Sequence, residues 1–222
     1  MNRSTAWILI SSKHEFAHAC VQYEKDVPKG MLPSGMSGSA PTAPASDLAR
    51  AIEIGPAEID NMSELRHLHA LSARRLAAGM FSEAEIASFA SYIYSEAYSA
   101  RIADIVRVRR LLAARLDGAL IGTAGWTPAN DAGAVARLMG VFISPLYARL
   151  GVGRRLVAAV EAEAHQAGFA VFTIRAPLGA AEFFTRLGYD VASHGVWPLD
   201  RDAALPVAFM RKIARVASVQ QP

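Results

Sequence analysis

The sequence of 222 residues contains one cysteine, Cys20. A single thiol cannot build a disulfide framework or a cysteine-based metal cluster, and this composition is typical of the reducing cytosol. No apolar run approaches the roughly 20 residues that a membrane-spanning helix needs. The apolar run at residues 7–10 is also too short for the core of a signal peptide. We therefore expect a cytoplasmic protein with no membrane partner.

Charge is scarce and nearly balanced. Charged residues make up 19% of the sequence and the formal net charge is +3. This excess is too small and too scattered for a nucleic-acid-binding protein, so no nucleic-acid partner is expected. The densest basic run, at residues 107–110, is most simply a solvated face. Because 52% of the residues are hydrophobic, we expect a globular protein, and the length suits one sizeable α/β domain plus a tail.

The first part of the chain differs from the rest. Residues 28–46 are dominated by Pro, Gly, Ser and Ala without a hydrophobic period, which is the composition of a flexible linker. We therefore predict a flexible N-terminal extension and linker over residues 1–46, a folded domain over 47–216 and a disordered tail over 217–222. The role of residues 1–46 stays open between a disordered arm, an interaction segment and an early start of the reading frame.

Hydrophobic periodicity and turn residues predict the elements of the folded domain. A capping box, Ser82-x-x-Glu85, predicts the start of the second helix, and Asp117-Gly118 predicts a hairpin turn. From the pattern alone the domain is mixed α/β, with a mostly antiparallel first half. The predicted strands cover residues 49–54, 106–116, 119–126, 134–143, 170–175, 189–197 and 205–213. The predicted helices run from Asn61 to Gly79, from Ser82 to about Ser99, from the glycine turn at 151–153 to Gly168, and from Gly179 to Leu187.

The glycine turn is the most informative feature of the sequence. A short apolar strand ending at Ile143 is followed by Pro145 and then by Leu150-Gly151-Val152-Gly153-Arg154 at the start of a helix. The first N–H groups of a helix have no partner within it, and the helix dipole is positive at this end. Glycines lack a side chain, so a diphosphate can approach the backbone closely. The turn is a candidate anion site, although glycines alone serve packing equally well.

Pro145, Gly151 and Gly153, followed by Phe183-Phe-Thr-Arg-Leu-Gly-Tyr189, resemble the GNAT acetyltransferase superfamily over residues 50 to 213. The resemblance implies an α/β fold with a mixed central sheet, helices on both faces and the order βααβββαβαββ. It implies an enzyme that moves the acetyl group of acetyl-CoA directly to a primary amine of a small molecule or peptide. It is also compatible with a homodimer. The turn lacks the Lys-Ser/Thr of a P-loop and the third glycine of a dinucleotide fingerprint, which disfavours a different nucleotide-binding module.

The resemblance also implies which residues hold acetyl-CoA. The strand ending at Ile143 would separate from the strand at 170–175 and pair with the pantetheine arm through its backbone. The backbone of the turn would bind the diphosphate. Ala148 stands where the superfamily usually has Arg or Gln, and the neighbouring Arg149 could compensate. The implied cofactor residues are Val141, Phe142, Ile143, Arg149, Leu150, Gly151, Val152, Gly153 and Arg154.

The residues that usually handle protons in the superfamily are missing. Phe184 replaces the Tyr that is often the general acid, and Met139 and Gly140 stand where a carboxylate is frequent. Pro177 replaces a frequent Asn. Three explanations stay open: water carries the protons, other side chains substitute, or the domain is a catalytically idle acyl-CoA-binding sensor.

Four side chains are weak candidates to replace the missing proton-transfer groups, and each has a simpler explanation: the two tyrosines as boundary aromatics, Glu96 as a solvated helix residue and His194 as a structural residue. Two of them, Tyr94 and Tyr98, would share one face of a continuous helix because they are four residues apart. His67 and His69 are two residues apart on a helix and would point in different directions, so no metal site is expected there. The candidates are Tyr94, Glu96, Tyr98 and His194.

Overall fold

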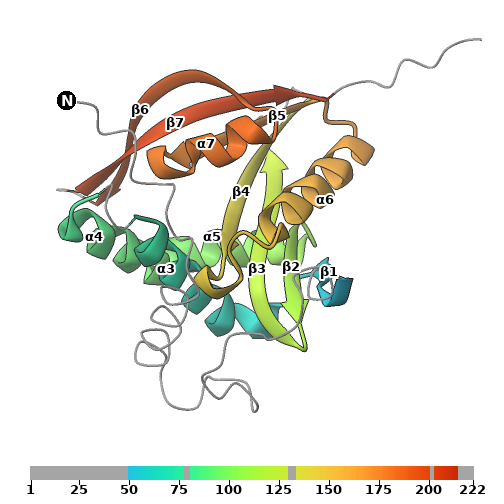
Figure 1. Cartoon of the computed structure of the whole chain (residues 1–222), viewed down its shortest axis with the longest axis horizontal. Coiled ribbons are helices and arrows are strands. Elements are labelled where there is room, and N and C mark those ends of the chain that lie inside the picture. The colour runs from blue at the N-terminus through green and yellow to red at the C-terminus, as the bar shows by residue number, and fades with distance from the viewer. Residues whose placement is uncertain (1–49, 78–80, 130–133, 201–202, 215–222) are drawn as a thin grey trace, which may run out of the picture.

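A seven-stranded sheet forms the centre of the protein, with the strand order β1-β2-β3-β4-β5-β7-β6 (Figure 1). The computed structural model describes residues 50–77, 81–129, 134–200 and 203–214. All neighbouring strands are antiparallel except β4 and β5, which are parallel. The strands are β1 (Glu53–Pro56), β2 (Leu111–Leu116), β3 (Ala119–Pro128), β4 (Val135–Ile143), β5 (Val171–Pro177), β6 (Asp190–Asp200) and β7 (Ala203–Ile213).

Helices cover both faces of this sheet. Two hydrophobic clusters lie on opposite sides of it, one under α6 and α7 and the other under α3, α4 and α5. The architecture is therefore the predicted α/β fold with helices on both faces. The helices are α3 (Met62–Ala77), α4 (Glu83–Tyr94), α5 (Glu96–Arg107), α6 (Val152–Gln166) and α7 (Leu178–Arg186), with 3-10 turns η1 (Ile59–Asn61) and η2 (Pro145–Tyr147).

The second predicted helix is two helices, which corrects the predicted element order. Ser82 and Glu85 form the predicted capping box at the start of α4. Ser95 then leaves the helical conformation, with φ −67° and ψ 155°, and its side chain accepts a hydrogen bond from the Tyr98 backbone N–H. Ser95 thus caps a new helix, as Ser commonly does. The order gains one helix and becomes βαααβββαβαββ.

Two strand boundaries were also predicted wrongly. Helix α5 continues to Arg107, so β2 begins at Leu111 rather than at Val106. The first strand is Glu53–Pro56 rather than 49–54. The hairpin at Asp117-Gly118 is confirmed: both residues have positive φ, as a two-residue turn of this kind requires. Of the three predicted domain segments, 1–46 and 217–222 lie outside the described residues.

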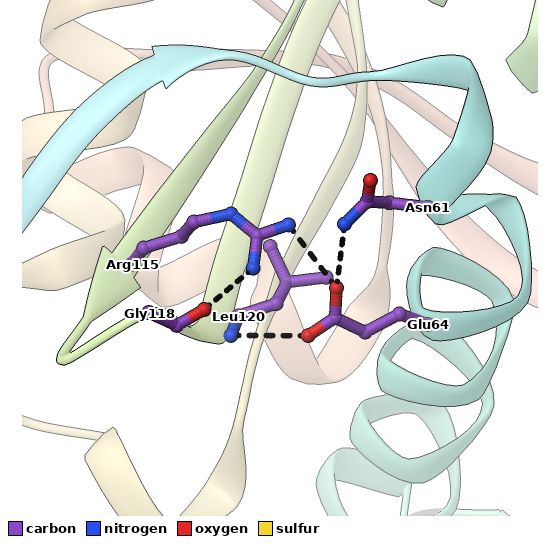
Figure 2. A network of polar contacts seen from close by, with 5 residues as sticks. All are labelled: Asn61, Glu64, Arg115, Gly118 and Leu120. Carbon is purple, nitrogen blue, oxygen red and sulfur yellow. Dashed lines mark hydrogen bonds and ion pairs between the residues drawn. The ribbon is translucent and has the colours of Figure 1, made fainter. Parts of the chain in front are cut away.

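One carboxylate ties helix α3 to the β2–β3 hairpin (Figure 2). Glu64 Oε2 accepts hydrogen bonds from Asn61 Nδ2 and Arg115 Nη2, both at 3.1 Å. Glu64 Oε1 accepts from the backbone N–H of Leu120 at 3.2 Å. Arg115 Nη1 donates to the Gly118 carbonyl oxygen at 2.7 Å. From the sequence, Asn61 is predicted only as the start of a helix, whereas this network links residues more than 50 positions apart.

Replacing this carboxylate should destabilise the fold measurably. In Glu64→Ala the Leu120 N–H, Asn61 and Arg115 all lose an acceptor, so we expect a loss of about 1–2 kcal/mol in the free energy of unfolding. Urea denaturation followed by circular dichroism measures it. Glu182→Ala is the control: its ion pair with Arg186 is exposed, and exposed pairs contribute about 0–1 kcal/mol. Equal losses in the two variants would contradict the proposed role of Glu64.

Candidate functional site

The glycine turn connects the end of β4 to the start of α6. Strand β4 ends at Ile143, η2 covers Pro145–Tyr147, and Gly151 is the N-cap of α6 with φ +79°. Arg149 also has positive φ, at 71°. The backbone of Gly151 is in the left-handed conformation, which glycine adopts freely and which is strained for a residue with a side chain. The N–H groups of the first turn of α6 point out of the helix toward this turn.

Gly153 brings three elements into close contact. A Cβ atom at this position would lie 3.1 Å from Phe183 Cζ and 3.4 Å from Ile143 Cγ1. The end of β4, the first turn of α6 and helix α7 therefore meet at Gly153. The absent side chain lets these three elements pack closely around the start of α6, where Gly153 is buried.

Strands β4 and β5 separate beside this turn. Their parallel pairing joins Val135–Leu138 to Val171–Ile174, whereas β4 continues to Ile143 and β5 to Pro177. A bulge in β4 accompanies the separation: Gly140 and Val141 together lie opposite Ala124 of β3, and Gly140 has φ +62°. Beyond Leu138, the edge of β4 that faces β5 no longer pairs with β5 in the described sheet.

A buried chain of hydrogen bonds ends on the bulge. His69 Nδ1 lies 2.7 Å from the Tyr98 hydroxyl, and His69 Nε2 lies 2.8 Å from Thr123 Oγ1. Thr123 Oγ1 donates to the Gly140 carbonyl oxygen at 2.6 Å. Because the Thr123 proton is used there, Thr123 accepts from His69 Nε2–H, and Nδ1 then accepts from Tyr98. The chain fixes one tautomer of His69 and holds the Gly140 peptide in place.

Burial sets the protonation states in this chain. His69 is fully buried, and desolvation lowers its pKa to about 3. Its ring stacks on Phe142, with centroids 4.3 Å apart. Burial is also the main cause that raises the pKa of Tyr98, with the charge of Tyr92 as a smaller one. His69 is therefore neutral near pH 7 with both nitrogens engaged, which makes it a structural group rather than a general base.

The described ranges 50–77, 81–129, 134–200 and 203–214 contain neither a candidate metal site nor a helix that could span a membrane. These residues contain no group of three His, Cys, Asp or Glu side chains placed to hold a metal ion. None of the helices in these ranges is long and apolar enough to cross a membrane.

The sequence matches the family described as the acetyltransferase (GNAT) domain over residues 77–196, which is more than half of the chain. The chain belongs to the GNAT acetyltransferase superfamily. The match spans the glycine turn, the bulge and the separation of β4 from β5. No curated protein matches the sequence closely enough to serve as a relative.

Solved structures show the same GNAT fold. A GCN5-related N-acetyltransferase from Rhodopseudomonas palustris is 24% identical with a TM-score of 0.64, covering 72% of this chain and 94% of that one. PaiA N-acetyltransferase from Thermoplasma acidophilum, in complex with coenzyme A, is 19% identical with a TM-score of 0.55, covering 73% and 98%. YncA from Salmonella typhimurium, solved with its cofactor acetyl-CoA, is 14% identical with a TM-score of 0.53, covering 77% and 98%.

The residues that the GNAT resemblance implies for the cofactor lie together in space. Val141, Phe142 and Ile143 form the last three residues of β4, from the bulge to the end of the strand, and all three are half-buried. The run from Arg149 to Arg154 forms the turn and the first residues of α6. Their contact with acetyl-CoA stays a prediction.

The weak catalytic candidates do not come together. Tyr94 and Tyr98 lie on different helices because of the break at Ser95; Tyr94 is exposed and Tyr98 is buried, so the expectation of a shared face was wrong. Glu96 is exposed at the start of α5, and His194 is exposed on β6. Tyr98 alone belongs to the site, as a partner of His69.

Phe184 offers no proton and does not line the turn. It is buried in the core under α6, where its ring centroid lies 5.7 Å from that of Tyr189. Tyr189 is buried, as expected for a core residue, and its hydroxyl donates to Glu161 at 2.8 Å. Phe183, the neighbour of Phe184, lies at the turn, where its ring packs against Gly153. The other predicted departures, Met139 and Gly140, lie on β4 at the bulge.

Sequence reasoning missed the contribution of His69 and Thr123. From the sequence, His69 is considered only as one half of a possible metal pair with His67. The available signal was its spacing from Leu65, which places it on the buried face of α3. A polar ring on that face needs a hydrogen-bond partner, and Thr123, within an otherwise apolar strand, supplies one.

Proposed function

We propose that the protein is an N-acetyltransferase that moves an acetyl group from acetyl-CoA directly to a primary amine. The observation that carries the proposal is the glycine turn at the N-terminus of α6, placed beside the end of β4 that no longer pairs with β5. Membership of the GNAT superfamily and the relatives solved with coenzyme A or acetyl-CoA support it. A primary amine of a small molecule or peptide is the proposed acceptor, and the cytoplasm is the proposed location.

The residues present fit coenzyme A at this site. Val141, Phe142 and Ile143 would present backbone N–H and C=O groups to the amides of the pantetheine arm, like an added strand. The N–H groups from Arg149 to Arg154 would bind the diphosphate, with the charges of the two arginines nearby. Backbone groups supply most of this binding, so Ala148 in place of Arg or Gln should weaken it rather than abolish it.

The transfer forms an N–C bond between the amine and the acetyl carbonyl carbon and breaks the C–S bond of the thioester. The amine loses one proton, and the departing thiolate takes one up. His69 is neutral, buried and fully bonded, and Tyr98 has a raised pKa. Phe184 has no proton to give. We therefore assign both proton transfers to water, with the neutral fraction of the amine as the nucleophile.

The missing proton-transfer groups favour a second candidate, an idle acyl-CoA-binding sensor. Neither Phe184 nor Met139 can exchange a proton, although both stand at positions where the superfamily often places acid or base groups. A sensor would bind coenzyme A through the same turn and would release no thiol with any amine. Binding and thiol release therefore have to be measured separately.

The test is a thermal melt of the full chain with CoA, acetyl-CoA, ATP and NAD. A ligand at 100 times its Kd adds about 2.7 kcal/mol to the free energy of unfolding, which raises Tm by roughly 5–10 °C for a chain of this size. We expect a shift with CoA and acetyl-CoA, and thiol release from acetyl-CoA with at least one amine of a broad panel.

The outcomes separate the candidates. A shift without thiol release across the panel would favour the sensor. A larger shift with ATP or NAD than with CoA, or no shift with any ligand, would contradict the assignment of the turn to coenzyme A.

A further inference from the structure

Three arginines gather on the side of the sheet that carries α3, α4 and α5. Arg137 lies on β4 opposite Thr173 of β5, and Arg175 is two residues further along β5. Side chains alternate between the faces of a strand, so Arg137 and Arg175 share one face. Burial lowers the pKa of Arg175, and the positive charges of Arg137 and of Arg101 on α5 lower it further, while Tyr92 raises it, so Arg137 and Arg101 both lie close enough to act on Arg175.

No carboxylate balances these charges within the part of the chain that the structure describes. Its four ion pairs involve other cations: Arg107, Arg115, Arg186 and Lys212. Asp104, one turn beyond Arg101 on α5, is bonded to Arg107 at 2.8 Å. Asp190 of β6 is paired in the sheet with Arg211 of β7, so it does not lie opposite Arg175. Arg101, Arg137 and Arg175 therefore have no anionic partner among the described residues. An anionic ligand would supply the missing negative charge.

Arg175 lies where β4 and β5 begin to separate. It directly follows Ile174, the last residue of β5 that pairs with β4. Its guanidinium stacks on Trp197 of β6, 4.6 Å from the ring centroid. Trp197 in turn packs edge-on against Tyr92 and Phe89 of α4, at 5.4 and 5.7 Å between centroids. An aromatic base therefore orients the guanidinium beside the place where the thioester would lie.

We propose that Arg175, together with Arg137 and Arg101, binds a carboxylate of the acceptor, so that the acceptor is a small amine that also carries a carboxylate. This rests on the proposed acetyltransferase function. A guanidinium is planar and binds a carboxylate through two parallel hydrogen bonds, and stacking on an aromatic ring leaves those donors available. The adjoining aromatic rings would contact the carbon skeleton between the amine and the carboxylate.

The kinetic test compares amino acids with their carboxamides as acceptors, with rates corrected for the neutral fraction of each amine. For the wild-type protein we expect kcat/KM to favour the acids by about tenfold or more. Arg175→Gln should reduce this preference at least about tenfold, mainly through KM, and Arg137→Gln and Arg101→Gln should reduce it less. Arg75→Gln, which removes an exposed arginine from α3, is the matched control and should leave the preference unchanged.

A binding test that needs no turnover accompanies it. Trp197 lies under Arg175, so its fluorescence should respond when an amino acid is added in the presence and in the absence of CoA. Trp197→Phe gives the background from Trp7 and Trp126. We expect a response to the acids that exceeds the response to the carboxamides and disappears in Arg175→Gln. No response to the acids, or an equal response in Arg175→Gln, would overturn the proposal.

The two tests separate failure of this inference from failure of the proposed function. Equal acetylation of acids and carboxamides would overturn the carboxylate site and leave the acetyltransferase standing. If no amine of either series releases thiol from acetyl-CoA, the proposed function fails, and the Trp197 response then decides alone whether the three arginines bind a carboxylate.

Discussion

Gly153→Glu should abolish the binding of coenzyme A while the protein remains folded. The substitution places a negative charge at the first turn of α6, where the diphosphate would bind, and two like charges a few ångströms apart repel strongly in a partly buried site. The new Cβ would lie 3.1 Å from Phe183 Cζ, which is the far end of a side chain that can turn aside. We expect Kd for CoA to rise by at least about 100-fold, or roughly 2.7 kcal/mol.

Isothermal titration calorimetry with CoA measures the affinity, and the melt without ligand shows that the variant is folded. Ala158→Glu is the matched control, because it makes the same charge change on the exposed face of the same helix. It should bind CoA with the parent affinity, within about twofold. If Gly153→Glu binds CoA as tightly as Ala158→Glu does, the turn is a packing feature and the cofactor site lies elsewhere.

Features set by neighbouring residues were predicted well from the sequence. The capping box at Ser82 and Glu85 depends on two side chains three residues apart, and the structure forms it. The hairpin at Asp117-Gly118 depends on two residues that tolerate positive φ. The glycine turn belongs to the same class, because Gly151 and Gly153 act through the backbone of their own segment. From these local signals alone the fold is predicted only as mixed α/β, and the GNAT layout is implied by the resemblance of the glycine turn and of residues 183–189 to that superfamily.

The break between α4 and α5 was missed because its signal competes with a stronger one. Ile86, Phe89, Ile93 and Ala97 keep a helical period across Ser95, which favours one long helix. Ser95 ends that helix by capping the next, through a hydrogen bond from the Tyr98 N–H at 3.2 Å. Ser followed by Glu96 is a typical helix start, so the sequence held the information. The break places Tyr98 in the core and turns Tyr94 outward.

Contacts between distant segments could not be predicted from the sequence. His69 meets Thr123 across 54 positions and Tyr98 across 29. The grouping of Arg101, Arg137 and Arg175 depends on the register of β4 against β5 and on the packing of α5. Periodicity assigns each of these residues to a face of its own element. Only the arrangement of the elements decides which faces meet, and the candidate acceptor side of the site is built from such contacts.

His69 should make the stability of the protein depend on pH below neutrality. An unfolded histidine takes up a proton near pH 6.5, whereas folded His69 does so only near pH 3, so the unfolded state binds more protons between these values. The stabilisation is complete above about pH 6.5 and is lost as the pH falls. Between pH 7 and pH 5 we expect the free energy of unfolding to decrease by about 2 kcal/mol on account of His69.

Urea denaturation at pH 7 and pH 5 measures this decrease, and His69→Gln should remove it because glutamine does not titrate. His67→Gln is the control: burial and the charge of Arg74 also lower the pKa of His67, so this variant removes a separate and smaller share. Tyr98→Phe leaves Nδ1 of His69 without a donor and should cost about 1–3 kcal/mol at pH 7. An unchanged pH dependence in His69→Gln would show that His69 can be protonated in the folded state. The assignment of a neutral His69 with one tautomer, which accepts from Tyr98 and donates to Thr123, would then be contradicted.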